Sequence, residues 1–277
     1  MDSLEDRWMK LQPHVQVFGP EDDDPRPAVL LFHGCGGVRS HITGYAEAAA
    51  EAGLRAFVID SYAPRGWSRT FALATVCSGV IFRGRDRAGD VLAALWGVAR
   101  RRDVDHTSLA AAGWSHGGWG IMELMSSPLS RAGEFGLTDP QGTDLSGLKA
   151  TVLVYPYVGI GATARMRPWR RCPRTLAVIA EQDHLTSVEN ASKVYDAVKA
   201  CGVEVQTWQA AGTHAFDEPG GNGLMKYDEV LTKEAYDRFV RFLQASLIPQ
   251  PEAKPAPKRR ARAAAPAQSA AQSAQAG

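Results

Sequence analysis

The sequence predicts an α/β fold in which a mainly parallel sheet carries helices on both faces. Short, continuous apolar runs, such as residues 28–32 and 54–59, are typical of strands that are covered on both faces. Segments with helical periodicity, such as residues 86–101, separate these runs along the chain. Strands that alternate with helices form parallel sheets through right-handed crossovers. With 277 residues, the chain is long enough for one large domain with a sizeable core.

The individual elements follow from the same patterns, taken in chain order. Strands are expected over residues 14–18, 28–32, 54–59, 107–112, 150–155, 175–180 and 203–208. Helices are expected directly after Gly118 and over residues 45–52, 86–101, 187–201 and 227–247. The segments 61–84 and 127–148 contain several turn-forming residues and are interpreted as irregular.

Charge and composition divide the chain into a body, residues 1–248, and a tail, residues 249–277. The net formal charge is +1, but five Lys or Arg and one Glu give the tail +4, which leaves −3 for the body. An acidic body argues against a nucleic-acid-binding domain. The Ala/Pro-rich tail has no large apolar side chain and is expected to be disordered. Its basic cluster is the one segment that could bind an anionic partner such as nucleic acid.

The location of the protein is predicted from its N-terminus, its hydropathy and its cysteines. The N-terminus is polar and acidic, which is unlike a signal peptide, and no apolar run approaches the length of a membrane span. The four cysteines lack CxxC spacing, which disfavours a metal site and redox chemistry: Cys35, Cys77, Cys172 and Cys201. We therefore expect reduced thiols, a cytoplasmic location and no membrane partner. The oligomeric state is left open.

A G-x-S-x-G motif at residues 113–117 lies between an expected strand and an expected helix. A serine at such a sharp turn is held in strained backbone geometry with its hydroxyl exposed, and the flanking glycines avoid collisions of a Cβ. The serine is Ser115, and the backbone N–H of His116 begins the helix, where it can bind a developing oxyanion. The pentapeptide alone is a weak signal, so the rest of the chain must support it.

Chemically reactive residues follow three other expected strands, at the edge where open α/β sheets place their function. The first of these strands runs into His-Gly-Cys-Gly-Gly at residues 33–37, a loop of the kind that contributes a second oxyanion N–H, here that of Cys35. Asp183 and His214 each follow a later strand. The order Ser115, Asp183, His214 is the one expected for nucleophile, acid and base in this arrangement.

Other residues compete for two of these roles. Glu181 and Asp217 are alternative acids, since both lie close to the expected strand ends. The alternative bases are the remaining histidines near the motifs: His33, His106, His116 and His184. Of these, His33 is interpreted as a structural residue of its glycine-rich loop, and His116 is expected to point away over the start of the helix.

With its HGCGG loop, GWSHGG, the Asp after the penultimate strand and G-T-H-A-F, the sequence resembles the dienelactone hydrolase family of α/β-hydrolases over about residues 25–247. The resemblance implies the α/β-hydrolase fold and a Ser-His-Asp triad that acts without a cofactor or metal. The archetypal family member has a cysteine at the position of Ser115 and lacks the glycine-rich loop. Dienelactone itself is therefore not the substrate that we expect.

The expected function is hydrolysis of a small ester or lactone through an acyl-serine intermediate. Alternatives are a serine peptidase or an acyltransferase with the same triad, and a non-catalytic binding protein on a hydrolase fold. Candidates for contact with the substrate lie next to the serine or after strand ends: Trp114, Arg83, Arg85 and Tyr155. The arginines could bind a substrate carboxylate, although solvated loop charge is the plainer interpretation.

Overall fold

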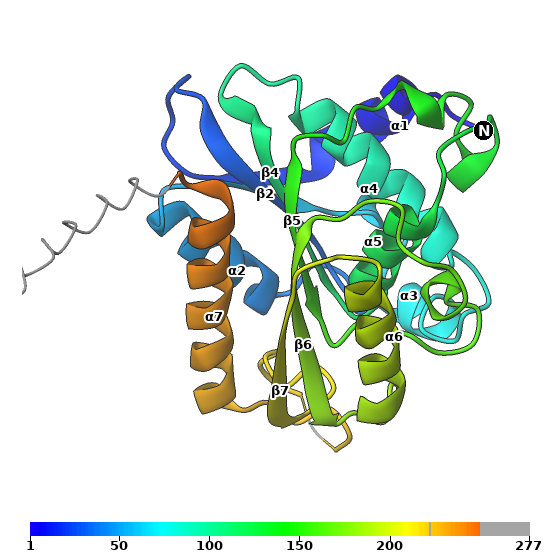
Figure 1. The fold of residues 1–277 in the computed structure, drawn as a ribbon, viewed down its shortest axis with the longest axis vertical. Helices are drawn as coiled ribbons and strands as arrows, with labels where there is room; N and C mark the ends of the chain where they lie inside the picture. Colours follow the sequence, from blue (N-terminus) through cyan, green and yellow to red (C-terminus); the bar gives the residue numbers. More distant parts are fainter. Residues whose placement is uncertain (222, 250–277) are drawn as a thin grey trace, which may run out of the picture.

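The computed structural model describes residues 1–221 and 223–249, and a seven-stranded sheet forms its centre (Figure 1). The strand order is β1-β3-β2-β4-β5-β6-β7; β1 runs antiparallel to β3, and the other neighbours are parallel. The strands are β1 (Val15–Phe18), β2 (Arg26–Phe32), β3 (Arg55–Ile59), β4 (Val104–Trp114), β5 (Leu148–Val154), β6 (Arg174–Gln182) and β7 (Val205–Thr213). The predicted α/β fold with a mainly parallel sheet is therefore confirmed.

Helices cover both faces of the sheet (Figure 1). One face carries α2 (Ser40–Glu51) and α7 (Glu229–Leu247). The opposite face carries α1 (Leu4–Leu11), α4 (Gly84–Val98), α5 (His116–Ser126) and α6 (Val188–Ala200). A short helix, α3 (Arg69–Thr75), lies in the connection between β3 and α4.

The core consists of two large apolar clusters, one on each face of the sheet. Successive residues of a strand contribute to different clusters, because side chains alternate between the two faces of a sheet. In β2, Val29 and Leu31 belong to the cluster under α2 and α7, whereas Leu30 and Phe32 belong to the other. This burial on both faces explains why the central strands have continuous apolar sequences. A third, small cluster contains Tyr62, Ala72, Val76 and Phe82.

Two helices were not predicted from the sequence. The N-cap of α1 is Ser3, whose hydroxyl accepts from the Asp6 N–H at 3.0 Å, while the Asp6 carboxylate accepts from the Ser3 N–H at 3.1 Å. The helix buries Leu4, Trp8 and Leu11, which are spaced to lie on one face. Helix α3 has only seven residues and buries little, so the segment 61–84 shows no helical periodicity.

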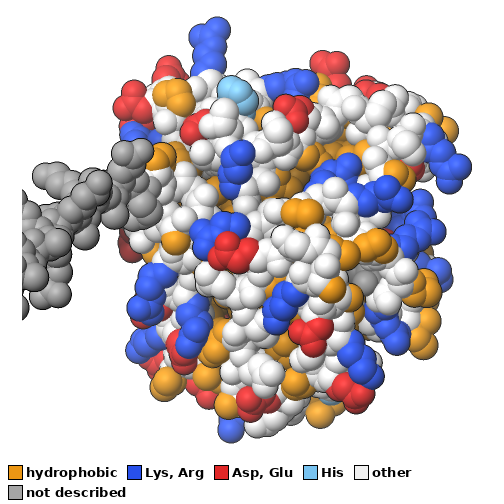
Figure 2. Space-filling view, in the orientation of Figure 1, with side chains coloured by type: hydrophobic (Ala, Val, Ile, Leu, Met, Phe, Trp, Pro, Cys, Tyr) orange, Lys and Arg blue, Asp and Glu red, His pale blue; other side chains and the backbone are white. Residues whose placement is uncertain are grey.

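On the face of the molecule shown in Figure 2, Lys and Arg side chains are interspersed with Asp and Glu. None of the helices in the described ranges is long and apolar enough to cross a membrane.

The division of the chain into a body, residues 1–248, and a tail, residues 249–277, stays a prediction. The prediction of a disordered, basic tail falls almost wholly on residues 250–277, which lie outside the described residues.

Candidate active site

Ser115 lies at the turn between β4 and α5 with φ 48° and ψ −109°. A positive φ is unfavourable for a residue with a Cβ, so the surroundings must hold the turn in this conformation. A Cβ at Gly117 would collide with the carbonyl oxygen of Phe32, and one at Gly113 would lie 2.5 Å from the amide nitrogen of Gly118. The two glycines of the motif therefore permit the close packing of strand and helix that keeps the serine at the turn.

The Ser115 hydroxyl is hydrogen-bonded to a histidine, which is bonded in turn to a carboxylate. His214 Nε2 lies 2.9 Å from Ser115 Oγ, and His214 Nδ1 lies 2.7 Å from Asp183 Oδ2. The other carboxylate oxygen of Asp183 accepts from the backbone N–H groups of Leu185 at 2.7 Å and Thr186 at 3.0 Å. The side chains of His214 and Asp183 are only 4% and 2% exposed. The carboxylate thus fixes the ring so that Nε2 can accept the hydroxyl proton when Nδ1 is protonated.

The three residues meet because each follows a parallel strand. Ser115 comes directly after β4, Asp183 after β6 and His214 after β7. The carboxyl ends of these strands lie at one edge of the sheet, so residues far apart in the chain come into contact. The structure therefore brings together the three residues to which the sequence assigned nucleophile, acid and base.

The glycine-rich loop, residues 33–37, lies directly against the serine. A Cβ at Gly34 would be 3.5 Å from the Cβ of Ser115. In the part of the chain that the structure describes, no hydrogen bond uses the backbone N–H of Cys35 or of His116. Within the described residues, these two N–H groups, the candidate oxyanion donors, therefore have no other acceptor.

His33 holds the glycine-rich loop in place. Its Nδ1 donates to the carbonyl of Gly34 at 2.7 Å, and its Nε2 accepts from the backbone N–H of Ser61 at 3.2 Å. Burial, followed by the charge of the Arg87 guanidinium, lowers the pKa of His33. The neutral ring, with both nitrogens hydrogen-bonded, holds the loop against the residues after β3, in keeping with the interpretation of His33 as a structural residue.

Among the described residues, none of the remaining alternative bases forms a hydrogen bond with the serine hydroxyl. His116 Nε2 donates to the carbonyl of Phe82 at 2.7 Å, and the two rings stack. Burial, followed by the charge of Arg87, lowers the pKa of His116 to about 3, so that its ring is neutral. His184 is exposed, with its ring 5.8 Å from that of His214, and His106 lies near the start of β4.

Asp217, one of the alternative acids, has a different set of partners. It is fully buried and accepts hydrogen bonds from the Tyr45 hydroxyl at 3.0 Å, from Trp114 Nε1 at 3.1 Å and from the Tyr155 hydroxyl. Glu181, the other alternative, is exposed. His214 Nδ1 donates to Asp183 instead. The Asp217 carboxylate therefore anchors the three aromatic side chains Tyr45, Trp114 and Tyr155.

A cavity of about 820 Å³ opens above Ser115 and His214. Its lining includes seven residues of the segment 63–83, which we call the wall segment: Arg69, Leu73, Val76, Cys77, Ser78, Gly79 and Arg83. Of the predicted substrate-contact residues, Trp114, Tyr155 and Arg83 line the cavity, whereas Arg85 does not. Trp114 and Tyr155 are almost fully buried, with their polar atoms bound to Asp217, so they present mainly ring surface.

Two other arginines line the cavity, and both are paired. Arg39 Nε lies 3.1 Å from Glu218 Oε1, and Arg69 Nη2 lies 3.4 Å from the same oxygen. By contrast, Arg65 is bound to the buried carboxylate of Asp90. Arg39 and Glu218 were not among the predicted site residues, because neither stands next to a strand end or in a motif.

The cysteines contradict one expectation. Cys35 and Cys77 form a disulfide, whereas the sequence analysis expected four reduced thiols. Only Cys172 and Cys201 are free, and both are exposed. The two cysteines are 42 positions apart in the sequence, so no local spacing indicates the pair; the fold brings the wall segment to the glycine-rich loop. The cysteines therefore no longer support a cytoplasmic location, which stays a prediction.

In the described ranges, no group of three or more His, Cys, Asp or Glu side chains is arranged to hold a metal ion. Within the same residues, the hydrogen-bonded Ser-His-Asp series is arranged for proton transfer to and from a serine hydroxyl.

Comparison with known proteins gives a family match and a set of similar folds. The sequence model of the dienelactone hydrolase family matches residues 14–247. No curated protein sequence matches the chain significantly. Among solved structures, Thermogutta terrifontis esterase 2 phosphorylated by paraoxon has a TM-score of 0.61 at 18% identity, with 85% of this chain and 90% of that chain covered.

Two further solved structures have the same fold. A protein from Klebsiella pneumoniae subsp. pneumoniae, provisionally assigned as a dienelactone hydrolase, has a TM-score of 0.60 at 18% identity and covers 83% of this chain and 91% of its own. A dienelactone hydrolase-like promiscuous phosphotriesterase from metagenomic libraries has a TM-score of 0.58 at 18% identity, with 84% and 92% covered. At such identities, the similarity establishes the α/β-hydrolase type of fold.

Proposed function

The chain belongs to the dienelactone hydrolase family, and from this premise we propose that it is a serine hydrolase that cleaves a small carboxylic ester or lactone. The observation that carries the proposal is the hydrogen-bonded series from Ser115 through His214 to Asp183. A serine hydroxyl is a poor nucleophile near neutral pH, and such a series supplies the base that it needs.

In the first half of the proposed reaction, Ser115 Oγ attacks the carbonyl carbon of the ester while His214 Nε2 takes the hydroxyl proton. Asp183 keeps the ring in position and stabilises the imidazolium that forms. The negative oxygen of the tetrahedral intermediate accepts hydrogen bonds from the N–H groups of Cys35 and His116. The carbon–oxygen bond to the alcohol then breaks, and His214 gives its proton to the departing alkoxide.

In the second half, water replaces the alcohol. The water oxygen attacks the carbonyl carbon of the acyl group on Ser115 while His214 Nε2 takes a proton from the water. A second tetrahedral intermediate then forms, and its negative oxygen accepts from the same N–H groups. When this intermediate collapses, the bond to Ser115 Oγ breaks, the serine recovers its proton from His214, and the carboxylic acid leaves. Every step uses side chains and backbone of this chain, with no cofactor or metal.

The cavity supports a small organic substrate. Its volume of about 820 Å³ is within the range of small-molecule sites, roughly 300–1,000 Å³. Apolar side chains such as Leu73 and Ile160 share its lining with the paired charges of Arg69 and Glu218. The esterase from Thermogutta terrifontis was solved phosphorylated by paraoxon, which supports the use of an organophosphate as a probe of Ser115.

The proposal is tested by a substrate panel with a matched variant. Purified wild-type protein and Ser115→Ala are compared on p-nitrophenyl esters of increasing acyl length, on lactones and on peptide p-nitroanilides, with and without an added alcohol. We expect the wild type to hydrolyse esters or lactones and Ser115→Ala to lose this activity while it keeps its melting temperature. Turnover confined to anilides would indicate a peptidase, and transfer to the alcohol in excess of hydrolysis an acyltransferase. Absence of Ser115-dependent turnover would contradict the proposal.

A further inference from the structure

We propose that Cys77 is a positioning residue: through its disulfide to Cys35 it holds the glycine-rich loop and the wall segment in their active arrangement. Reduction of this bond by a dithiol then weakens catalysis. The inference rests on the proposed function, since the loop supplies one of the two oxyanion donors there. Cys77 itself touches no reacting atom in this account.

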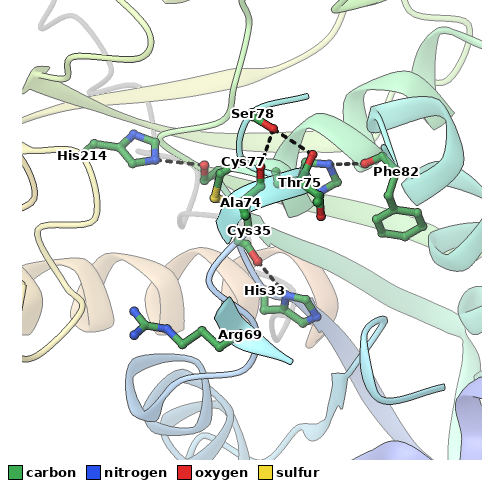
Figure 3. Close-up of a disulfide and its surroundings, with 12 residues drawn as sticks. His33, Cys35, Arg69, Ala74, Thr75, Cys77, Ser78, Phe82 and His214 are labelled. Atoms are coloured by element: carbon green, nitrogen blue, oxygen red, sulfur yellow. Dashed lines mark hydrogen bonds between the residues drawn. A yellow bond between two sulfur atoms is a disulfide. The ribbon is translucent and has the colours of Figure 1, made fainter. Parts of the chain in front are cut away.

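The disulfide lies at the site. Figure 3 shows the bond between Cys35 and Cys77, with His214 to its left. Both cysteines line the cavity together with Ser115 and His214. Cys35 belongs to the loop that packs against the serine, and Cys77 follows α3 in the wall segment. The bond therefore joins a proposed oxyanion donor to one side of the substrate cavity.

The wall segment is tied to the body of the protein near its two ends, where Arg65 binds the Asp90 carboxylate and the Phe82 carbonyl accepts from His116. Its buried apolar side chains, Ala72, Val76 and Phe82, form a small cluster with Tyr62 that is separate from the two large clusters on the sheet. Its ion pair across the cavity, between Arg69 and Glu218, is 3.4 Å long, and the Arg69 side chain is half exposed. Exposed ion pairs contribute little to stability. The covalent bond is thus the strongest link between the segment and the glycine-rich loop.

A second contact shows how closely the loop depends on this segment. The Tyr62 hydroxyl, just before the wall segment, donates to the carbonyl of Cys35 at 3.3 Å. Cys35 also packs against the small apolar cluster of which Tyr62 and Val76 are members. Cys35, the proposed oxyanion donor of the loop, is therefore held from the wall side by one long hydrogen bond, by packing and by the disulfide. Loss of the disulfide leaves the two weak restraints.

The bond is open to chemical reduction. Cys77 is exposed, whereas Cys35 is half-buried, so a reductant reaches the Cys77 sulfur first. A thiolate of the dithiol attacks Cys77 Sγ, and Cys35 leaves as a thiolate that takes up a proton. The second thiol of the reductant closes the mixed disulfide and releases Cys77 as a thiol. Two electrons and two protons pass to the protein, and the dithiol becomes a cyclic disulfide.

The two consequences of reduction differ. Freedom of the glycine-rich loop misplaces the N–H of Cys35, which lowers kcat because that donor acts on the tetrahedral intermediate. Freedom of the wall segment disorders cavity-lining side chains such as Leu73 and Val76, which raises KM. A purely structural disulfide would change the melting temperature and leave kcat and KM of the folded enzyme unaltered.

The test compares the oxidised and the reduced wild-type enzyme on the best ester of the panel. The variants Cys77→Ser and Cys77→Ala remove the disulfide, and the double variant Cys172→Ser/Cys201→Ser is the matched control that keeps it. Free thiols are counted, and kcat, KM and the rate of fluorophosphonate labelling are measured below the melting temperature of each sample. Complete loss of an oxyanion donor costs about 10²–10³ in kcat, so for a loosened donor we expect about a tenfold loss. Reoxidation should restore the wild type, and the control should respond to dithiol as the wild type does.

Both Cys77 variants should resemble the reduced wild type and show no further response to dithiol. The inference is overturned if the wild type, with four free thiols, keeps its kcat, KM and labelling rate. If the variants fail to fold, reduction and reoxidation of the wild type decide alone. An oxidised enzyme with Ser115-dependent activity that is indifferent to dithiol refutes this inference only, whereas an oxidised enzyme without such activity refutes the proposed function as well.

Discussion

The two sides of the cavity are held in place by different means. On the sheet side, Ser115, Asp183 and His214 follow β4, β6 and β7, and the strands are buried in two large apolar clusters. On the wall side, residues 63–83 are held by one small cluster and a disulfide, and near their ends by Arg65 bound to Asp90 and by the hydrogen bond from His116 to Phe82. The side that carries the proposed chemistry is thus built on the rigid centre of the molecule. The side that shapes the cavity is a separately anchored segment.

The comparison suggests a division of labour. Reacting groups need fixed distances, and a buried parallel sheet supplies them at the ends of its strands. A substrate cavity tolerates more variation, so its wall can be formed by a connection between elements. We therefore expect changes on the sheet side to abolish catalysis and changes on the wall side to modulate it.

The largest effects are predicted for the two residues that exchange the proton. Ser115→Ala and His214→Ala should each lower kcat by about 10⁶, and the double variant should be no worse, because a triad acts as a unit. Esterase assays over long incubation times measure the residual rates, and thermal unfolding controls for folding. Substantial turnover by His214→Ala would assign the base elsewhere.

A somewhat smaller loss is expected for Asp183→Asn, about 10⁴ in kcat, since the ring would be held in the wrong tautomer. Asp217→Asn is the matched control, because Asp217 is also a carboxylate three residues from His214 in the chain but bonds to Tyr45, Trp114 and Tyr155. It should lower the melting temperature and change kcat only a few-fold. The reverse pattern would show that Asp217 is the acid.

His116, which follows Ser115 on the sheet side and donates to the carbonyl of Phe82 on the wall side, predicts a pH dependence of stability. The pKa of His116 is lowered to about 3 in the folded protein, chiefly by burial. Below its ordinary pKa of about 6.5, the unfolded chain binds a proton there that the folded protein does not. The free energy of unfolding should therefore fall as the pH drops from 6.5 towards 4.5, by up to about 1.4 kcal/mol per pH unit from this residue.

Urea unfolding of the wild type and of His116→Gln over this pH range measures the contribution. Gln cannot titrate but can still donate to the Phe82 carbonyl, so its slope should be shallower. Identical slopes for the two proteins would mean that His116 is not kept neutral by the fold.

The smallest effect is expected on the wall side, from Arg83. This arginine lines the cavity and is exposed, whereas its near neighbour Arg85 is exposed but outside the lining. For an ester with a carboxylate, Arg83→Ala should lower kcat/KM by at most about fivefold, since exposed ion pairs contribute up to about 1 kcal/mol. The loss should fade at high salt. An equal loss in Arg85→Ala would show that both act only through the general charge of the surface.

What the sequence could predict follows the same division. The meeting of Ser115, Asp183 and His214 could be predicted because each stands directly after a strand, and the apolar runs of buried strands are visible in the sequence. The glycines of the serine turn were likewise predictable, because their need for close backbone approach is local.

The wall side could not be derived in this way. The pairing of Cys35 with Cys77 depends on how the connection after β3 folds back over the sheet edge, and neither cysteine has a local signature. The separation of Arg83 from Arg85 depends on where α4 begins. Helix α1 was missed although its capping box, Ser3 with Asp6, is present in the sequence, because its eight residues give a short periodic pattern.

The measurement that tests the central claim most directly is the mass of the protein after reaction with an organophosphate or fluorophosphonate probe. The account predicts one adduct per chain, located by peptide mapping on Ser115, and no adduct in Ser115→Ala. His214→Ala should react far more slowly, because its serine lacks a base. An adduct on another residue, or labelling that persists in Ser115→Ala, would contradict the claim that Ser115 is the nucleophile.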